Sequence, residues 1–175
     1  LPRRWDAPLT DSDNWPRAVQ IAWQLHDEWG ALIEHQDFLI KPDGFDVPYD
    51  AEKVHGISTQ LAEAQGVPIA EVFKVFNEAL SKAKYVVGQN IGFDINIMGA
   101  EFYRYGVESP LTQMPVIDTC TEATANLCQI AGGKGGRYKL PTLTELHSFL
   151  FGVPFAEAHN ATADVEATTR CFFEL

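Results

Sequence analysis

The sequence predicts an α/β fold in which the first two strands run antiparallel and the later strands run parallel. Two apolar-rich segments near the start are joined by a short turn, which is the pattern of a β-hairpin. Further along, short apolar segments alternate with longer segments whose apolar residues follow the helical repeat. Such alternation is typical of parallel strands connected by helices, so we expect a mixed central sheet with helices on both faces.

The first half of the sequence begins with a polar segment, residues 1–16, which is predicted to be a loop. Strands are expected at residues 18–25 and 32–40, with a turn between them, and residues 42–50 form a second loop. A short helix is expected at residues 51–54, and Ser58 is placed to cap another. Residues 68–82 predict an amphipathic helix, because proline is favoured at a helix start and five apolar residues follow at helical spacing.

The second half alternates short strands, at residues 85–88 and 116–117, with helices at residues 92–105 and 119–130. A glycine-rich basic loop follows at residues 132–139, and the last helices are expected at residues 143–151 and 161–173. No internal repeat or linker divides residues 1–175, so we expect one domain. The sequence ends within an apolar helical stripe, which predicts that the domain is part of a longer polypeptide.

The composition is that of a globular, acidic protein. Of the 175 residues, 46% are hydrophobic and 21% are charged, and the net charge is −11. No apolar stretch approaches the roughly 20 residues of a membrane span. Three cysteines without a C-x-x-C spacing, and no leader pattern, lead us to expect a cytoplasmic protein. So acidic a protein is a poor non-specific binder of duplex DNA, although a metal-assisted phosphate site would require carboxylates.

Asp94 lies where a core residue is expected. In the predicted helix 92–105 it shares a face with Ile97, Met98, Glu101 and Phe102, and that face should pack on the sheet. A buried carboxylate needs a cation or a proton. The alternative is an aspartate in the first helical turn that is stabilised by the helix dipole.

A second carboxylate repeats this arrangement near the end of the sequence. Asn160 is a good N-cap, which places His159 in the preceding loop and Asp164 early in the last helix, on its apolar side. Two inward aspartates and a loop histidine are what a hard cation such as Mg²⁺ or Mn²⁺ requires, with the histidine as general base. Taken alone, His159 is better explained as a loop histidine that bonds to backbone, and it is the two clusters together that favour the metal site.

Three motifs give the sequence a family resemblance: Asn90-x-x-Phe93-Asp94, His159-x4-Asp164, and Val54-His55-Gly56-Ile57-Ser58. Their order and separation resemble those of the DEDDh (DnaQ-like) 3′–5′ exonucleases, whose fold is RNase H-like, over nearly the whole chain. Residues 15–26 and 139–147 also resemble the proofreading exonuclease of bacterial DNA polymerase III, including the exonuclease segment found in some polymerase chains.

The resemblance implies phosphodiester hydrolysis with two divalent metal ions, Mg²⁺ or Mn²⁺, releasing nucleoside 5′-monophosphates from the 3′ ends of single-stranded DNA. It assigns Asp94 and Asp164 as metal ligands and His159 as the base that takes the proton from water. It also implies a role in proofreading, with a polymerase III subunit or a fused polymerase region as partner.

The family's first motif, Asp-x-Glu on the first strand, is absent from the sequence. We therefore expect that strand and its two carboxylates in the parent polypeptide, immediately upstream. Two alternatives stay open: a 3′–5′ exoribonuclease of the same family, and a non-catalytic module associated with a polymerase.

The resemblance also suggests substrate contacts at four residues, each of which has a simpler structural explanation. His55 and Gly56 would form a lip over the terminal nucleotide, or a turn with a structural histidine. Phe93 would stack on a base, or belong to the core. Asn90 would contact substrate, or bond to backbone around its turn.

Other residues give weaker signals. Asp118 is expected to cap the helix that follows it, more than to bind metal. Three cations make the loop 132–139 a candidate phosphate contact or a solvated loop. Arg3, Arg4 and Trp5 would flank the site, whereas His26, His35 and His147 are expected at the surface.

Overall fold

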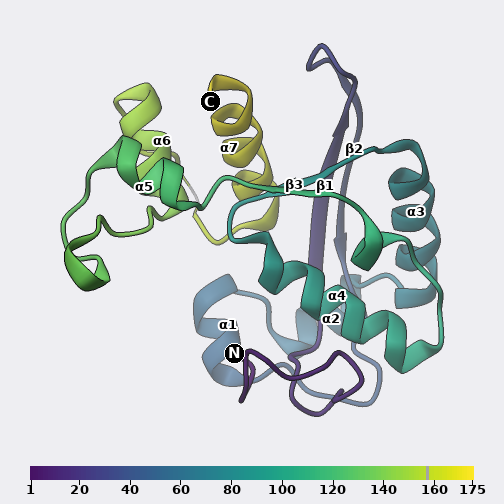
Figure 1. Cartoon of the computed structure of the whole chain (residues 1–175). Helices are drawn as coiled ribbons and strands as arrows, with labels where there is room; N and C mark the ends of the chain where they lie inside the picture. The colour runs from purple at the N-terminus through teal and green to yellow at the C-terminus, as the bar shows by residue number, and fades with distance from the viewer. Residues whose placement is uncertain (157) are drawn as a thin grey trace.

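Four short strands and seven helices make up the computed structural model, which describes residues 1–156 and 158–175 (Figure 1). The strands are β1 (Gln20–His26), β2 (Leu32–Leu39), β3 (Val86–Gly88) and β4 (Val116–Asp118). The helices are α1 (Tyr49–His55), α2 (Thr59–Gln65), α3 (Ile69–Lys82), α4 (Ile91–Tyr105), α5 (Glu122–Cys128), α6 (Leu143–Phe151) and α7 (Ala161–Glu174). Single 3₁₀ turns occupy Leu111–Gln113 and Lys134–Gly136. None of the described helices has the length and apolar character needed to span a bilayer.

The hairpin β1–β2 is antiparallel, as predicted, and its turn is stabilised by Asp27. The Asp27 carboxylate accepts backbone hydrogen bonds from Trp29 and Ala31, both at 2.9 Å. Gly30 completes the turn at φ 84°, a left-handed conformation that glycine adopts without a steric penalty. The local sequence therefore determines both the turn and the register of the hairpin.

β1 is covered by helices on both faces, because its side chains alternate in direction. Trp23 points to the main core, where its ring centroid lies 5.1 Å from that of Phe76 in α3, and α4 contributes Met98 and Phe102 to the same core. On the opposite face, Gln24 accepts a hydrogen bond from Thr169 of α7 at 3.3 Å. The expectation of helices on both faces of the sheet is confirmed.

The strands β3 and β4 pair in parallel, also as predicted. The expected single central sheet is replaced, in the described residues, by two separate two-stranded sheets, β1–β2 and β3–β4. Helix α7 packs against both β1 and β3 and so joins the two sheets. The strand predictions were thus correct, whereas hydrogen bonding between the two pairs was not found.

Helix boundaries agree with the sequence except around α5, which is shorter than the expected 119–130. Thr121 caps α5 by accepting a hydrogen bond from the Thr124 backbone amide, so the helix begins only at Glu122. At the other end, Gln129 takes a left-handed conformation and ends the helix. Ser58 and Asn160 cap α2 and α7 as predicted.

Candidate active site

Asp94 lies in the first turn of α4, the helix that follows strand β3. The residue is exposed and not enclosed in the core, so the alternative given for it, an aspartate in the first helical turn, agrees with the structure. Neighbouring groups nevertheless displace part of the water around its carboxyl group. The fully buried acid of this helix is Glu101, which binds Arg17 at 2.9 Å and Arg104 at 3.1 Å. The sequence analysis missed this cluster because Arg17 is distant in sequence, and the two cations explain why the buried charge is tolerated.

Asp164 lies in the first turn of α7 and is half-buried. Its Oδ1 accepts a hydrogen bond from the backbone amide of His159 at 3.2 Å. His159 has a positive φ of 73° and an exposed side chain, so the loop turns sharply just before the helix. The backbone amide of His159 is thus hydrogen-bonded to Asp164, the other member of the predicted motif His159-x4-Asp164. The imidazole of His159 stays accessible.

Asp94 of α4 lies near enough to Asp164 of α7 for the two charges to interact. The pKa of Asp94 is raised to about 6, first because surrounding atoms displace water from its carboxyl group, and then because the negative charges of Asp118 and Asp164 lie near it. The pKa of Asp164 is also raised by desolvation, although the His159 amide opposes this. Two helix N-termini therefore bring acids that are 70 positions apart into one electrostatic site.

Asp118 does not cap the helix that follows it, so that prediction is wrong. It ends β4, and its Oδ1 accepts hydrogen bonds from the backbone amides of Asn90 and Cys120, both at 2.8 Å. Its Oδ2 accepts from the amide of Ile91 at 3.2 Å. Because β3 and β4 are parallel neighbours, the end of β4 lies beside the start of α4, and Asp118 caps that helix instead.

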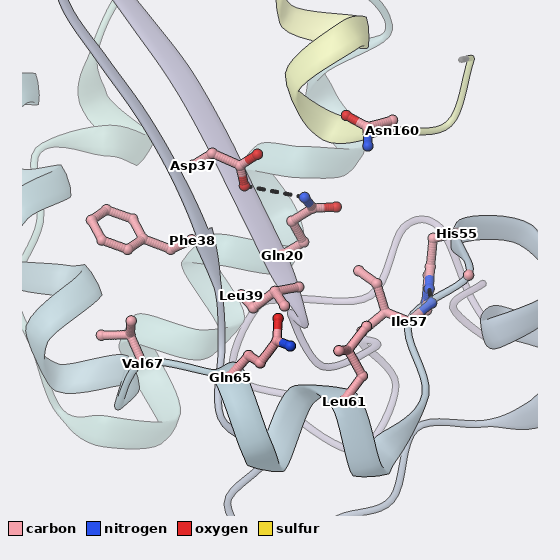
Figure 2. Close-up of a pocket in the computed structure, with 11 residues that line it drawn as sticks. Gln20, Asp37, Phe38, Leu39, His55, Ile57, Leu61, Gln65, Val67 and Asn160 are labelled. Atoms are coloured by element: carbon pink, nitrogen blue, oxygen red, sulfur yellow. Dashed lines mark hydrogen bonds between the residues drawn. The ribbon is translucent and has the colours of Figure 1, made fainter.

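The sequence-predicted lip residues line an open cavity of about 520 Å³ (Figure 2). The cavity lies between the α1–α2 connection, the hairpin β1–β2 and the start of α7, and its lining includes His55, Gly56 and Asn160. The His55 Nδ1 accepts a hydrogen bond from the Ile57 amide at 3.0 Å, so His55 does have the structural role given as its alternative. Burial lowers the pKa of His55, which favours the neutral ring that accepts this bond.

Phe93 and Asn90 lie at the start of α4, beside Asp94. Phe93 is half-buried, and its ring centroid is 5.4 Å from that of Trp5 in the N-terminal loop. Asn90 has a left-handed backbone, and its side chain makes no capping hydrogen bond. The favoured interpretation, that the Asn90 side chain bonds around its own turn, is therefore wrong, because the carboxylate of Asp118 takes that role.

Among the histidines expected at the surface, His35 is exposed and His26 is half-buried, but His147 is buried. The His147 ring contacts the Val153 carbonyl at 2.7 Å through Nδ1 and the Arg170 Nε at 3.3 Å through Nε2. It therefore ties α6 to α7, a contact that no local pattern indicates. In the loop 132–139, Lys139 pairs with Glu145, whereas Lys134 and Arg137 are exposed.

The oxygen donors at this site suit a hard divalent cation, since Asp94 and Asp164 repel each other and a cation between them would remove the repulsion. However, the described residues contain no group of three or more acidic, histidine or cysteine ligands arranged to hold a metal ion. Metal binding by Asp94 and Asp164, with His159 as the general base, therefore stays a prediction.

Comparisons with known protein sequences indicate the family of this chain. A family model described as an exonuclease, that of the RNase T family, matches residues 21–172. A DNA polymerase III of the PolC type from Pediococcus pentosaceus is 30% identical over 141 residues, which is 81% of this chain and 9% of that protein.

Solved structures of E. coli exonuclease I share the fold. Its complex with a dT13 oligonucleotide has a TM-score of 0.72 at 23% identity, over 91% of this chain and 37% of that one. A zinc-bound form in complex with single-stranded DNA has a TM-score of 0.67 at 25% identity, over 88% of this chain and 35% of that one.

This chain belongs to the exonuclease family and has the RNase H-like fold of the DEDD-type 3′–5′ exonucleases. It spans about a third of exonuclease I and less than a tenth of the PolC-type polymerase to which it is similar.

Proposed function

We propose that this domain removes nucleotides from the 3′ end of single-stranded DNA and proofreads during DNA replication. The observation that carries the proposal is that Asp94 and Asp164, each in the first turn of a helix, lie near enough for the charge of Asp164 to raise the pKa of Asp94. The family match and the DNA-bound exonuclease I structures support the same activity.

In the proposed reaction, Asp94 and Asp164 would hold divalent ions, Mg²⁺ or Mn²⁺. Such ions, when bound, would supply Lewis-acid stabilisation of the negative charge that develops on the scissile phosphate. His159 takes the proton from the attacking water, and its exposed ring on a sharply turned loop is free to approach substrate. Water attacks in line, the 3′ oxygen leaves, and a nucleoside 5′-monophosphate is released without a covalent intermediate.

The open cavity beside this site is proposed to take the terminal nucleotide, with His55 and Gly56 at its edge. Asn90 and Phe93 are proposed as further contacts at the start of α4. The mixed polar and apolar lining of the cavity suits a nucleoside, which presents an apolar ring face and polar edges.

The remaining metal ligands are proposed to be an Asp-x-Glu pair on a further strand of the parent polypeptide. The strand pairing supports this, because in the described residues β1 pairs only with β2, and β3 only with β4. The PolC-type relative supports a polymerase III partner or a fused polymerase region, and the cysteine content supports a cytoplasmic location.

The test compares the trimming of matched DNA and RNA oligonucleotides by the full-length protein, with Mg²⁺ and with EDTA. We expect metal-dependent release of 5′-monophosphates from the 3′ end of DNA, faster than from RNA. Faster trimming of RNA would establish the exoribonuclease alternative. No trimming of either substrate with Mg²⁺ or Mn²⁺ would leave a non-catalytic polymerase-associated module.

A further inference from the structure

The N-terminal loop, residues 2–16, is held firmly along α4, the helix that carries Asp94. Ala7, Leu9 and Trp15 pack against Ala100 of that helix. A Cβ atom at position 99 would lie 2.6 Å from Leu9 Cδ1, so the Leu9 side chain would have to shift to admit a larger residue there.

Hydrogen bonds fix the same loop at two further points. Arg104 of α4 donates to the carbonyl oxygens of Ser12 and Trp15, the latter at 2.6 Å. Within the loop, the Arg4 amide donates to Asn14 Oδ1 at 2.7 Å, and Asn14 Nδ2 donates to the Arg4 carbonyl at 2.8 Å. These contacts set the position of residues 3–6 relative to the start of α4.

This anchored loop presents an aromatic side chain beside the candidate active site. Trp5 contacts Phe93, the residue directly before Asp94, with an angle of 49° between the ring planes. Trp5 nevertheless remains 56% exposed, and its neighbours Arg3 and Arg4 are also exposed. Arg4 forms a surface ion pair with Asp6, and among the described residues Arg3 has no carboxylate partner.

An exposed indole held against a second ring, with cations next to it, has the composition of a stacking surface for single-stranded nucleic acid. A base stacks on the aromatic face, and an arginine neutralises an adjacent phosphate. The local cations are needed here, because the protein has a net charge of −11 and some of its carboxylates lie in the candidate active site.

We propose that Trp5 and Phe93 form a platform on which one base near the 3′ end of single-stranded DNA stacks, with Arg3 beside a neighbouring phosphate. The proposal rests on the proposed exonuclease function, and it adds Trp5 and Arg3 as substrate contacts outside the three sequence motifs. It predicts that Trp5 contributes to substrate binding and not to the chemical step.

The test uses the full-length protein in EDTA and a short single strand with 2-aminopurine at one of its last four positions. Wild-type protein should quench the fluorescence strongly at one of these positions. Trp5→Ala should abolish that quenching and weaken binding about tenfold, whereas Trp5→Phe should retain most of both. With Mg²⁺, Trp5→Ala should raise KM and leave kcat nearly unchanged.

Two further variants separate stacking from simple packing. Trp29→Ala is the matched control, because Trp29 is 83% exposed at the tip of the hairpin and should not affect binding. Trp5→Leu keeps an apolar contact with Phe93 but lacks a flat aromatic face, so it should bind as weakly as Trp5→Ala at an unchanged thermal midpoint.

The outcomes distinguish this proposal from the proposed function. If the wild type trims DNA while Trp5→Leu or Trp5→Ala binds and quenches as the wild type does, the platform is refuted and the exonuclease function stands. If the wild type neither binds nor trims single-stranded DNA, both are refuted.

Discussion

The helices α4 and α7 both carry an aspartate in their first turn, yet their N-termini are built differently. α7 is capped locally, because Asn160 accepts hydrogen bonds from the amides of Thr162 and Ala163 and Asp164 accepts one from His159. α4 has no side-chain cap of its own and depends on Asp118 from a neighbouring strand. The carboxylate of Asp164 therefore accepts a hydrogen bond from its own loop, whereas the carboxylate of Asp94 lies near the negative charges of Asp118 and Asp164.

Both carboxylates are nevertheless disfavoured as charged groups. Desolvation raises the pKa of Asp94 to about 6 and also raises the pKa of Asp164, and in each case a backbone hydrogen bond opposes the rise. A divalent ion at this site would therefore relieve unfavourable charge at both aspartates.

The largest expected effect is the loss of activity when Asp164 is replaced. Asp164→Ala in the full-length protein should abolish metal-dependent degradation of DNA and leave the circular dichroism spectrum unchanged. Glu166→Gln is the matched control, since Glu166 is exposed two positions along the same helix and should keep wild-type activity. Retained degradation by Asp164→Ala would contradict the assignment of this residue as a ligand.

The next effect concerns His159. His159→Ala should reduce kcat by about 10²–10⁴, the usual contribution of a general base, while metal affinity stays near that of the wild type. His35→Ala, which replaces an exposed histidine on the hairpin, should have no effect. A kcat within error of the wild type for His159→Ala would show that another group accepts the proton.

A smaller effect is expected in the stability of the metal-free protein. The pKa of Asp94 is raised to about 6 in the folded state, from 3.8 in the unfolded state. Protonation of Asp94 therefore stabilises the folded state below pH 4, and this stabilisation is lost as the pH rises from about 4 to 6. At pH 7.5, Asp94→Asn should therefore be more stable than the wild type, by about 1 kcal/mol or less because solvent screens this exposed group.

Denaturant unfolding in EDTA, at pH 4 and pH 7.5, measures this difference. Glu78→Gln on the exposed side of α3 is the control, and Mg²⁺ should stabilise the wild type more than Asp94→Asn. Equal stability of Asp94→Asn and the wild type at both pH values would show that neither desolvation nor the nearby charges raise the pKa of Asp94 in the folded protein.

A further effect on stability, of similar size, tests the capping of α4 from another strand. Asp118→Asn should destabilise the fold by about 1 kcal/mol, because an amide replaces the carboxylate that accepts three backbone hydrogen bonds. Glu71→Gln, an exposed acid in the first turn of α3, should cost less. If the two variants unfold at the same denaturant concentration, the cap contributes little.

The sequence by itself determined the order and type of the elements, and it indicated Asp94, His159 and Asp164 as candidate site residues whose roles stay predictions. Hairpin turns, helical spacing and helix caps involve residues within a few positions of one another, so a local pattern is sufficient to predict them. This is why the cap at Asn160, the hairpin at residues 27–30 and the amphipathic helix α3 agree with the structure.

Only the tertiary structure determined which charged residues lie close together. Glu101 pairs with Arg17, Asp118 caps α4, and the buried His147 contacts Arg170. Each of these contacts joins residues more than 20 positions apart. The contact of Trp5 with Phe93 is of the same kind. Such contacts depend on how whole helices and strands pack in space, and no local periodicity encodes that arrangement.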